Sequence, residues 1–377
     1  MKQTYGDFPK TYQFNTNVYL VTNVKHIKTI LDNSPHIFGA GTLKKDFFHS
    51  FMKHNVGISE GCPWKQRRQM NEYALDSGNI HQFSVFHDKN IQTYIRSYLN
   101  LQRLEFTDFS QMGKTLTSQI VFGVDQVPEE VYQLFSEANA TEAIRNPDFR
   151  IDPKIYNIYH QTLKYYMNHP QPNSLVQLCL QYSKHQEEIY HQIPHFMFPI
   201  AGLFTAVIPR LLTLLFNHPH ELRKLKQEIN TTKKEKIHTM KYSRKCILEG
   251  LRLMNPVITT FRTLLKDFSF DKKHTFPKGT QFLILNNPVL REKEYFKQPN
   301  LFIPSRWNPI MEQSYYAISF NQGPQKCPGK ELVITLIQSF LYHFFTIKQY
   351  KYYQTSIIDT NEIPQIINPC SLFFEFK

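Results

Sequence analysis

The sequence predicts a mainly α-helical protein with a small β region. Long apolar segments, which suit helices packed in a core, are spread along the chain: Phe106–Phe122, Ile193–Phe216 and Leu332–Phe340. Short apolar and aromatic segments between turn-forming residues suit strands, and they occur near both ends and once in between. With 377 residues, the chain is long enough to bury a large core.

Local patterns predict the elements in chain order. Val18–Val21 is an apolar run bounded by Asn and Thr, which predicts a short strand. Gly57, Gly61 and Pro63 predict turns before the next helix. Helices are predicted at Asn23–Asp32, Trp64–Leu75, Phe106–Phe122, Glu129–Ala140, Tyr156–Met167, Leu175–Tyr190 and Glu221–Ile229. Further strands are predicted within Phe268–Ile284 and at Phe373–Phe376, and loops at Asn146–Asp152 and Thr231–Lys236.

The composition limits the classes of partner. The chain carries 44 basic and 31 acidic residues, a formal net charge of +13, which suits nucleic acid, an anionic membrane or an acidic protein. Because no basic block is interleaved with aromatic residues, we expect no nucleic-acid partner. The five cysteines are scattered and form neither a zinc pattern nor a disulfide framework, which favours a reducing compartment.

The start of the sequence and its longest apolar run bear on location. Met1–Asp7 lacks the charged and apolar regions of a signal peptide, so we expect a cytoplasmic protein without an N-terminal membrane anchor. Ile193–Phe216 is long enough to span a bilayer, but it contains His195, Arg210 and three prolines. A buried helix that crosses the protein is the favoured interpretation, with at most peripheral membrane contact.

The segment Phe320–Gly329 contains one cysteine, Cys327, in a loop shaped by glycine and proline. A long apolar helix pattern follows at once, and a helix N-terminus favours the thiolate form that binds metals. Pro328 suits the first helical position. Gly323 and Gly329 allow positive φ or a close approach of the backbone to a flat ligand.

This loop has two competing interpretations. A single cysteine is often only a small buried apolar residue. A phosphate-binding loop is excluded, because the spacing from Gly323 to Lys330 is one residue too long and Glu331 replaces the Ser or Thr that would hold magnesium.

Further motifs occur upstream. Glu249 and Arg252 are three residues apart, so they share a helix face, and their neighbours are apolar. A buried pair of this kind is costly unless further hydrogen bonds hold it, so it marks a fixed architecture better than a surface pair does, although a solvated pair is the commoner case. Trp64 and Arg68, four residues apart, share another helix face. Arg306 lies in the segment Phe302-Ile303-Pro304-Ser305-Arg306-Trp307.

In this order, the motifs resemble those of the cytochrome P450 family, and the resemblance covers nearly the whole chain from Trp64 onward. It implies a single P450-like domain over residues 1–377 that binds haem b (iron protoporphyrin IX). It further implies that Cys327 ligates the iron in a loop with Phe320, Gly323 and Gly329. The resemblance assigns Trp64, Arg68 and Arg262 to the haem propionates, and Glu249, Arg252 and Arg306 to the scaffold.

The resemblance also extends to Ala201–Thr205. Gly202 would leave space for dioxygen, and Thr205 would donate a hydrogen bond beside it. Phe204 stands where the family usually has an acid that helps to deliver protons. We interpret Phe204 as a packing residue that also changes the proton supply.

A second departure lies two residues before the cysteine, where the family usually has Arg or His and this chain has Gln325. Because Gln325 is uncharged, anchoring of the propionates falls mainly on Arg68 and Arg262. The direction of Lys326 is open.

The expected function is a haem-thiolate monooxygenase that inserts oxygen into an apolar organic substrate, with a reductase or ferredoxin as electron donor. Basic residues are expected to gather on the cysteine side, where acidic donors dock: Lys65, Arg67, Lys326 and Lys330. One alternative is a peroxide-using or isomerising haem-thiolate enzyme, and another is a haem-binding protein without catalytic activity.

Overall fold

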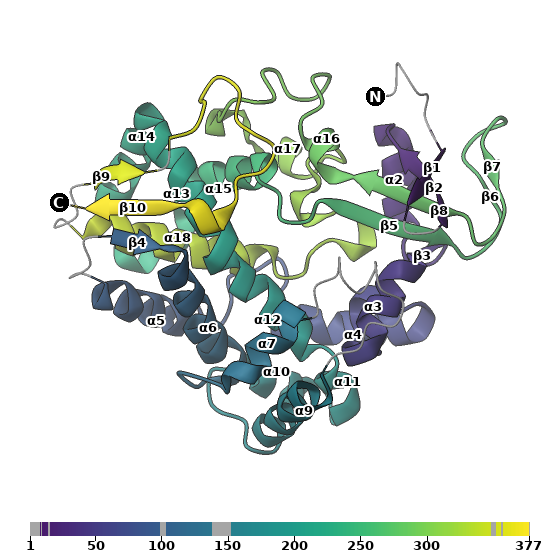
Figure 1. Ribbon diagram of the computed structural model, residues 1–377, viewed down its shortest axis with the longest axis horizontal. Helices are drawn as coiled ribbons and strands as arrows, with labels where there is room; N and C mark the ends of the chain where they lie inside the picture. Colours follow the sequence, from purple (N-terminus) through teal and green to yellow (C-terminus); the bar gives the residue numbers. More distant parts are fainter. Residues whose placement is uncertain are drawn as a thin grey trace.

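The computed structural model describes residues 8, 10–13, 16–98, 103–137, 152–347, 352–355 and 357–376. Within these ranges the protein is mostly helical, and its strands form three small sheets. In Figure 1 the helices fill the left and lower parts of the molecule, while the five-stranded sheet lies at the right. The predicted fold class, mainly α with a small β region, is confirmed.

The N-terminal half is a series of helices separated by short connections. These are α2 (Val24–Asp32), α3 (Thr42–Met52), α4 (Gly61–Ala74), α5 (Ser84–Ser97), α6 (Phe106–Phe122), α7 (Glu129–Glu137), α9 (Pro153–Asn168), α10 (Leu175–Tyr182) and α11 (Gln186–Tyr190). One 3₁₀ turn, η1 (Val56–Ile58), precedes α4.

The C-terminal half holds the central helical run and the helix that follows the cysteine loop. Its helices are α12 (Ile193–Gly202), α13 (Ile208–Asn217), α14 (Pro219–Thr231), α15 (Lys241–Leu253), α16 (Asn286–Leu290), α17 (Pro309–Glu312) and α18 (Lys330–Thr346). A π-helical segment, η2 (Leu203–Val207), joins α12 to α13. The 3₁₀ turns are η3 (Lys234–Thr239), η4 (Pro304–Arg306), η5 (Ile318–Phe320), η6 (Gly323–Gln325) and η7 (Pro369–Ser371).

The largest sheet joins N-terminal strands to strands from the second half of the sequence in the order β1-β2-β8-β5-β3. β2 runs parallel to β8, and β5 runs antiparallel to both β8 and β3. A separate apolar cluster packs around this sheet. The strands are β1 (Lys10–Gln13), β2 (Thr16–Val21), β3 (Phe38–Ala40), β4 (Arg103–Glu105), β5 (Thr259–Leu264), β6 (Phe268–Ser269), β7 (Thr275–Phe276), β8 (Gln281–Leu285), β9 (Tyr352–Thr355) and β10 (Phe373–Phe376).

Capping residues explain where several helices begin and end. Asn23 accepts a hydrogen bond from the Lys25 N–H at 2.9 Å and starts α2. Glu105 and Asp108 form a capping box at the start of α6. The same helix ends at Gly123, whose φ of 75° is left-handed and suits glycine.

The central run, which consists of α12, η2 and α13, crosses the molecule and packs on α6 (Figure 1). A Cβ atom at Gly113 of α6 would lie 3.1 Å from the Ala201 carbonyl oxygen, so glycine permits this close approach. The continuous helical stretch Gln186–Asn217 is long and apolar enough to span a membrane, and 61% of its most apolar window is buried inside the protein. Length and composition alone do not distinguish such a helix from a core helix.

Some boundaries differ from the sequence-based expectation, and others fall outside the described residues. α18 begins at Lys330 with Gly329 as its N-cap, so Pro328 lies in the preceding turn and not at the first helical position. α14 continues to Thr231 and η3 begins at Lys234, which leaves little of the loop predicted at Thr231–Lys236. The loop predicted at Asn146–Asp152 lies almost wholly outside the described residues, as does the end of the helix predicted at Glu129–Ala140.

Candidate functional site

The cysteine loop joins η5 to α18. The Cys327 N–H donates to the Phe320 carbonyl oxygen at 2.8 Å, which closes the loop. Cys327 is partly exposed, although burial is the largest effect on its pKa and raises it above the usual thiol value. The backbone N–H of Gly329 and the charges of Arg68 and Lys330 act in the opposite direction and favour the thiolate.

The two loop glycines have different roles. Gly323 has a φ of 70°, and a Cβ there would lie 2.5 Å from the Leu31 carbonyl oxygen at the end of α2. Glycine is therefore required for the loop to pack on α2. Gly329 has a φ of −89°, and a Cβ there would meet only Leu75, at 3.7 Å.

Glu249 and Arg252 of α15 form a fully buried pair. Arg252 donates to both carboxylate oxygens at 2.9 Å and to the carbonyl oxygen of Pro299 at 2.7 Å. The same carboxylate accepts from Arg306 at 3.0 Å and from the Trp307 indole N–H at 2.8 Å. The structure thus brings together Glu249, Arg252 and Arg306, and it adds Trp307, which the sequence did not single out.

This network keeps Glu249 ionised. Burial alone would raise its pKa, but the charge and hydrogen bonds of Arg252, then Arg306 and the Ile303 N–H, hold the pKa below its usual value. Because every lone pair of the carboxylate faces a donor, the network joins α15 to the segment that contains η4.

Trp64 and Arg68 are both buried on one face of α4. Arg68 donates to Glu72 Oε1 at 2.7 Å and to the Lys326 carbonyl oxygen at 2.6 Å, so it contacts the cysteine loop. Its Nη2 atom is buried and has no hydrogen-bond partner within the described part of the chain. That free donor is suited to an anion.

Arg262 of β5 lies beside a lysine that sequence reasoning missed, Lys44 of α3. Burial lowers the pKa of Arg262 to about 10, and burial followed by the charge of Arg262 lowers the pKa of Lys44 to about 8. Burial, Lys44 and Arg68 together lower the pKa of His195 to about 4. Among the described residues neither Lys44 nor Arg262 forms an ion pair with a carboxylate. This cationic group therefore lacks an anion.

No sequence signal would have identified Lys44. It is one of two adjacent lysines on α3, and its neighbour Lys45 pairs with Glu60. Lys44 donates to the Gly57 carbonyl oxygen at 3.0 Å instead. Only the packing of α3 against β5 brings its charge to Arg262.

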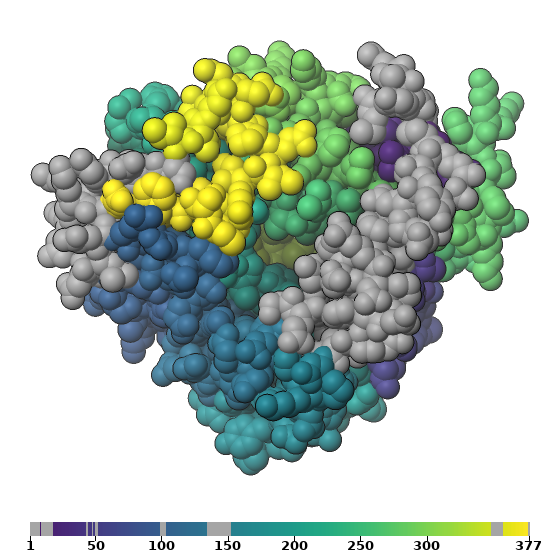
Figure 2. Space-filling model, viewed as in Figure 1, coloured from purple at the N-terminus to yellow at the C-terminus, as the bar shows by residue number. Residues whose placement is uncertain are grey.

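The central run offers space at Gly202. A Cβ at Gly202 would have no atom within 4 Å, which means that this position borders open space. Thr205 lies in the π-helical segment, a feature frequent at functional sites, and its hydroxyl donates to the Ala201 carbonyl oxygen at 3.0 Å. In this conformation the Thr205 oxygen can still accept a hydrogen bond, while its proton is used within the helix. In Figure 2 the face toward the viewer is hollowed at its centre.

Phe204 is fully buried. Its Cβ lies 3.5 Å from the position that a Cβ at Gly113 would occupy, so Phe204 packs against α6. The packing part of the interpretation of Phe204 is thus observed, while its effect on proton supply stays a prediction.

The cysteine loop also borders a cavity of about 740 Å³. Arg244 bridges Glu312 and Glu331 there at 2.7 and 2.8 Å, and Lys330 pairs with Glu312 at 2.9 Å. Its lining includes Cys327 and charges of both signs: Glu72, Asp76, Arg244, Glu312, Lys326, Lys330 and Glu331.

The predicted basic cluster on the cysteine side is wrong for Arg67. Arg67 pairs with Glu188 of α11 and donates to His54, because it lies on a different side of α4 from Arg68. Lys65 and Lys326 are exposed, but the charge of Lys330 is matched by Glu312. The surface beside Cys327 is therefore mixed in charge.

Comparison with known proteins decides the family. The family model described as Cytochrome P450 matches residues 95–369, well over half of the chain, and the matched region includes Cys327 and the Glu249 network. The chain belongs to the cytochrome P450 family. The recognition made from the motifs is confirmed, and the match begins after Trp64 and Arg68.

Curated relatives of this P450 match over shorter regions. Beta-amyrin 28-monooxygenase of Solanum lycopersicum is 32% identical over 166 residues, which cover 44% of this chain and 33% of that protein. Taxoid 7-beta-hydroxylase of Taxus cuspidata is 33% identical over 152 residues, covering 37% of this chain and 30% of that protein. The chain thus spans about a third of the length of the curated relatives it matches.

The P450 family implies a haem cofactor, and the residues present fit one. Cys327 supplies a partly exposed thiol at the start of α18. Arg68 offers a buried donor without a partner, and Lys44 and Arg262 form a cationic pair without a carboxylate, as anchoring of propionates requires. Gly202 leaves space beside the central run.

Proposed function

We propose that this P450 is a monooxygenase that binds haem b through Cys327 and inserts oxygen into an apolar organic substrate. The carrying observation is the environment of Cys327, a thiol at a helix start that accepts the Gly329 N–H and lies near Arg68 and Lys330. The names of the relatives, which refer to oxidation of beta-amyrin and of taxoids, support an apolar substrate.

Haem, when bound through a thiolate, supplies the activation of oxygen. The chain contributes binding, orientation and proton positions. Arg68, Arg262 and Lys44 would hold the propionates through charge-assisted hydrogen bonds. Arg68 has a buried Nη2 donor without a partner among the described residues, and Arg262 and Lys44 form no ion pair with a carboxylate there, so all three could retain the cofactor. Gly202 leaves room for the reacting molecules. The hydroxyl oxygen of Thr205 can accept a hydrogen bond from a donor group in that space.

An electron donor of the reductase or ferredoxin type is part of this proposal, as is a cytoplasmic location. The mixed charge beside Cys327 gives a donor both cationic and anionic partners: Lys326 is exposed there, and Glu312 and Glu331 lie close by. We expect the rate of electron transfer to fall with ionic strength, because exposed charges are screened by salt.

The test of the cofactor site is an absorption spectrum of the purified full chain, reduced and exposed to carbon monoxide. The parent should show the red-shifted band of thiolate-bound haem, and Cys327→His should lose it while still binding haem. Cys370→Ser, at an exposed cysteine, is the matched control and should keep the band. The same band in Cys327→His would refute the assignment.

A second candidate function rests on Phe204. Because this side chain is apolar and fully buried where the family usually has an acid, the chain lacks that route for protons. An enzyme that takes a preformed peroxide, or that rearranges an oxygenated substrate, needs less proton delivery. Haem binding without turnover by either route would instead indicate a non-catalytic haem protein.

A further inference from the structure

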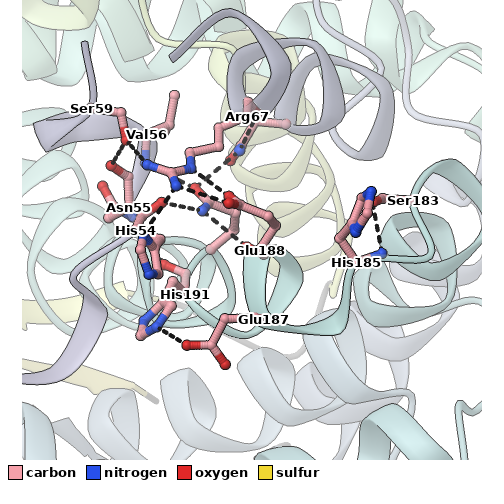
Figure 3. A network of polar contacts seen from close by, with 12 residues as sticks. His54, Asn55, Val56, Ser59, Arg67, Ser183, His185, Glu187, Glu188 and His191 are labelled. Carbon is pink, nitrogen blue, oxygen red and sulfur yellow. Dashed lines mark hydrogen bonds and ion pairs between the residues drawn. The ribbon is translucent and has the colours of Figure 1, made fainter. Parts of the chain in front are cut away.

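Three metal-ligating side chains form a cluster within a network of polar contacts (Figure 3). His54 follows α3, while Glu187 lies on α11 and His191 ends it. One ligand atom from each residue lies within 4.8 Å of the other two. None of the three takes part in the proposed haem site.

The spacing within this cluster, called the His54–Glu187–His191 cluster, suits a metal ion. Glu187 and His191 are four residues apart on one helical turn, and His191 Nε2 lies 3.1 Å from Glu187 Oε1. Zinc bonds of about 2.0–2.1 Å separate tetrahedral ligand atoms by roughly 3.4 Å. That pair is already near this separation, and His54 needs to move closer by at most about 1.5 Å.

The two imidazole rings are held together by the fold. Their centroids are 4.9 Å apart at an interplanar angle of 67°. His191 is only 4% exposed, and its Nδ1 atom has no hydrogen-bond partner in the described part of the chain. Ligation through Nε2 would replace its hydrogen bond to Glu187 Oε1 by bonds of both atoms to a shared ion, with the ring hydrogen on Nδ1. Figure 3 shows the His54 ring beside that of His191.

The surrounding charges permit a cation. Arg67 is the nearest positive group, and Glu188 accepts hydrogen bonds from its Nε and, at 2.9 Å, from its Nη2. This bidentate pair neutralises Arg67. Lys53 lies 3.9 Å from Glu187, whose side chain is 65% exposed, so this weak surface pair can yield to an ion.

Binding has two identifiable costs. His191 gives up its hydrogen bond to Glu187, and its buried Nδ1 then carries a hydrogen that has no partner within the described residues. The second cost is at His54. Arg67 donates to His54 Nδ1 at 3.0 Å, which places the ring's own hydrogen on Nε2. To ligate through Nε2, His54 must carry its proton on Nδ1, and Arg67 must give up that hydrogen bond. Arg67 keeps its bonds to Glu188 and to Ser59 Oγ, so one hydrogen bond is exchanged for one metal bond.

We propose that His54, Glu187 and His191 bind one divalent transition-metal ion, with zinc as the ion that suits two imidazoles and a carboxylate. The exposed side of Glu187 leaves the remaining coordination positions to water. The ion joins the segment after α3 to the start of the central run. It therefore stabilises the position of α3, which carries Lys44, relative to α12. The proposal is independent of the proposed function.

The test uses the haem-loaded full chain, dialysed to equilibrium against zinc, with zinc and iron then measured per chain. The parent should hold one zinc. His54→Gln, Glu187→Gln and His191→Gln should each weaken zinc binding by more than about tenfold, which is the loss seen when even an outer partner of a metal site is removed. His220→Gln is the matched control, because His220 is an exposed histidine that also lies near a glutamate, with its Nε2 4.0 Å from Glu221.

Two outcomes would overturn the proposal: a parent that holds no zinc, or zinc that remains in all three variants and is therefore bound elsewhere, such as at the exposed Cys62 or Cys370. Haem content and far-UV circular dichroism check folding. Glu187→Gln decides the matter if a buried-histidine variant does not fold, because the Glu187 side chain is exposed. Zinc should also raise the Tm of the parent but not of these variants.

Discussion

At the scale of single residues, the distribution of cationic side chains around the candidate haem site differs from the one that the family resemblance implies. Gln325 is neutral where the family resemblance leads one to expect a cation, and its side chain forms no hydrogen bond in the described structure. Lys44 instead brings a buried charge next to Arg262 from the distant helix α3. We therefore predict that Lys44 supplies the cation that Gln325 does not.

Lys44→Met should release haem faster than the parent. A hydrogen bond to a charged group contributes about 1.5–3 kcal/mol, which corresponds to a tenfold or greater increase in the dissociation rate. The measurement is transfer of haem to an excess of a haem scavenger. Lys45→Met is the control, because Lys45 pairs with Glu60 at the surface. Equal rates for the two variants would show that Lys44 does not contact the cofactor.

Phe204→Asp should improve the coupling of electrons to product when a reductase and NADPH drive the reaction. The parent should couple poorly but respond relatively better to added peroxide, because Phe204 cannot carry protons. Product per electron is compared at equal haem content, with Phe204→Leu as the apolar control. Since the site is fully buried, the carboxylate also carries a desolvation cost. If the parent couples electrons to product efficiently and Phe204→Asp leaves the coupling unchanged, Phe204 serves only in packing.

At the scale of elements, the Glu249 carboxylate joins α15 to the segment around η4. Four residues donate to it: Arg252, Ile303, Arg306 and Trp307. The spacing of Glu249 and Arg252 was visible in the sequence, but the contributions of Ile303 and Trp307 were not. The contact between the two elements therefore depends on one ionised side chain.

Glu249→Ala should destabilise the protein by about 3–5 kcal/mol, because it leaves two buried arginines without their carboxylate. The expected readout is a lower urea midpoint and little haem-loaded protein. Glu129→Gln is the control, since Glu129 pairs with Lys114 at the surface and should change stability by less than about 1 kcal/mol. If both variants unfold at the parent's midpoint, the network does not stabilise the fold.

Gly323→Ala should disrupt the packing of the cysteine loop on α2. The new methyl group meets the Leu31 carbonyl oxygen at 2.5 Å and also requires a positive φ. Gly78→Ala separates these effects, because Gly78 has a φ of 84° but open space around it. Backbone strain alone costs about 1–2 kcal/mol. We expect Gly323→Ala to lose more stability than Gly78→Ala in urea unfolding; a smaller or equal loss would mean that the loop adapts.

At the scale of the whole molecule, the helical core and the sheet region form two apolar clusters, and buried polar groups lie between the helices. One such group, His87 of α5, is 2% exposed, and neither ring nitrogen has a partner within the described residues. Burial, and then the nearby His81, lowers its pKa to about 3. Asp76 lies 3.9 Å from His81 on the other side.

This histidine should make stability depend on pH. Its folded pKa is below the ordinary 6.5, so the unfolded chain binds the extra proton between pH 6.5 and about 3. The free energy of unfolding should therefore fall by about 1.4 kcal/mol per pH unit from this group as the pH decreases through that window. His87→Leu should show a shallower decline between pH 6.5 and 5, measured by urea unfolding. Parallel curves would show that His87 titrates normally.

Much of the fold followed from local patterns. Phe106–Phe122 was predicted with both of its ends, because the helix has a clear apolar face and Gly123 ends it. The start of α18 was misplaced by two residues, since Pro328 suits either a turn or a first helical position. The basic cluster failed at Arg67, because charge counts do not say which acid on another helix accepts the hydrogen bonds.

The fold class, the family, the cysteine loop and the Glu249–Arg252 pair could all be predicted from the amino-acid sequence. These depend on spacing along the chain, and spacing sets which side chains share a helix face or a loop. Three contacts became visible only in the folded protein: Lys44 lies near Arg262, Phe204 packs on α6, and the His54 ring lies beside His191. Such contacts arise when segments far apart in sequence pack together, so no local pattern encodes them.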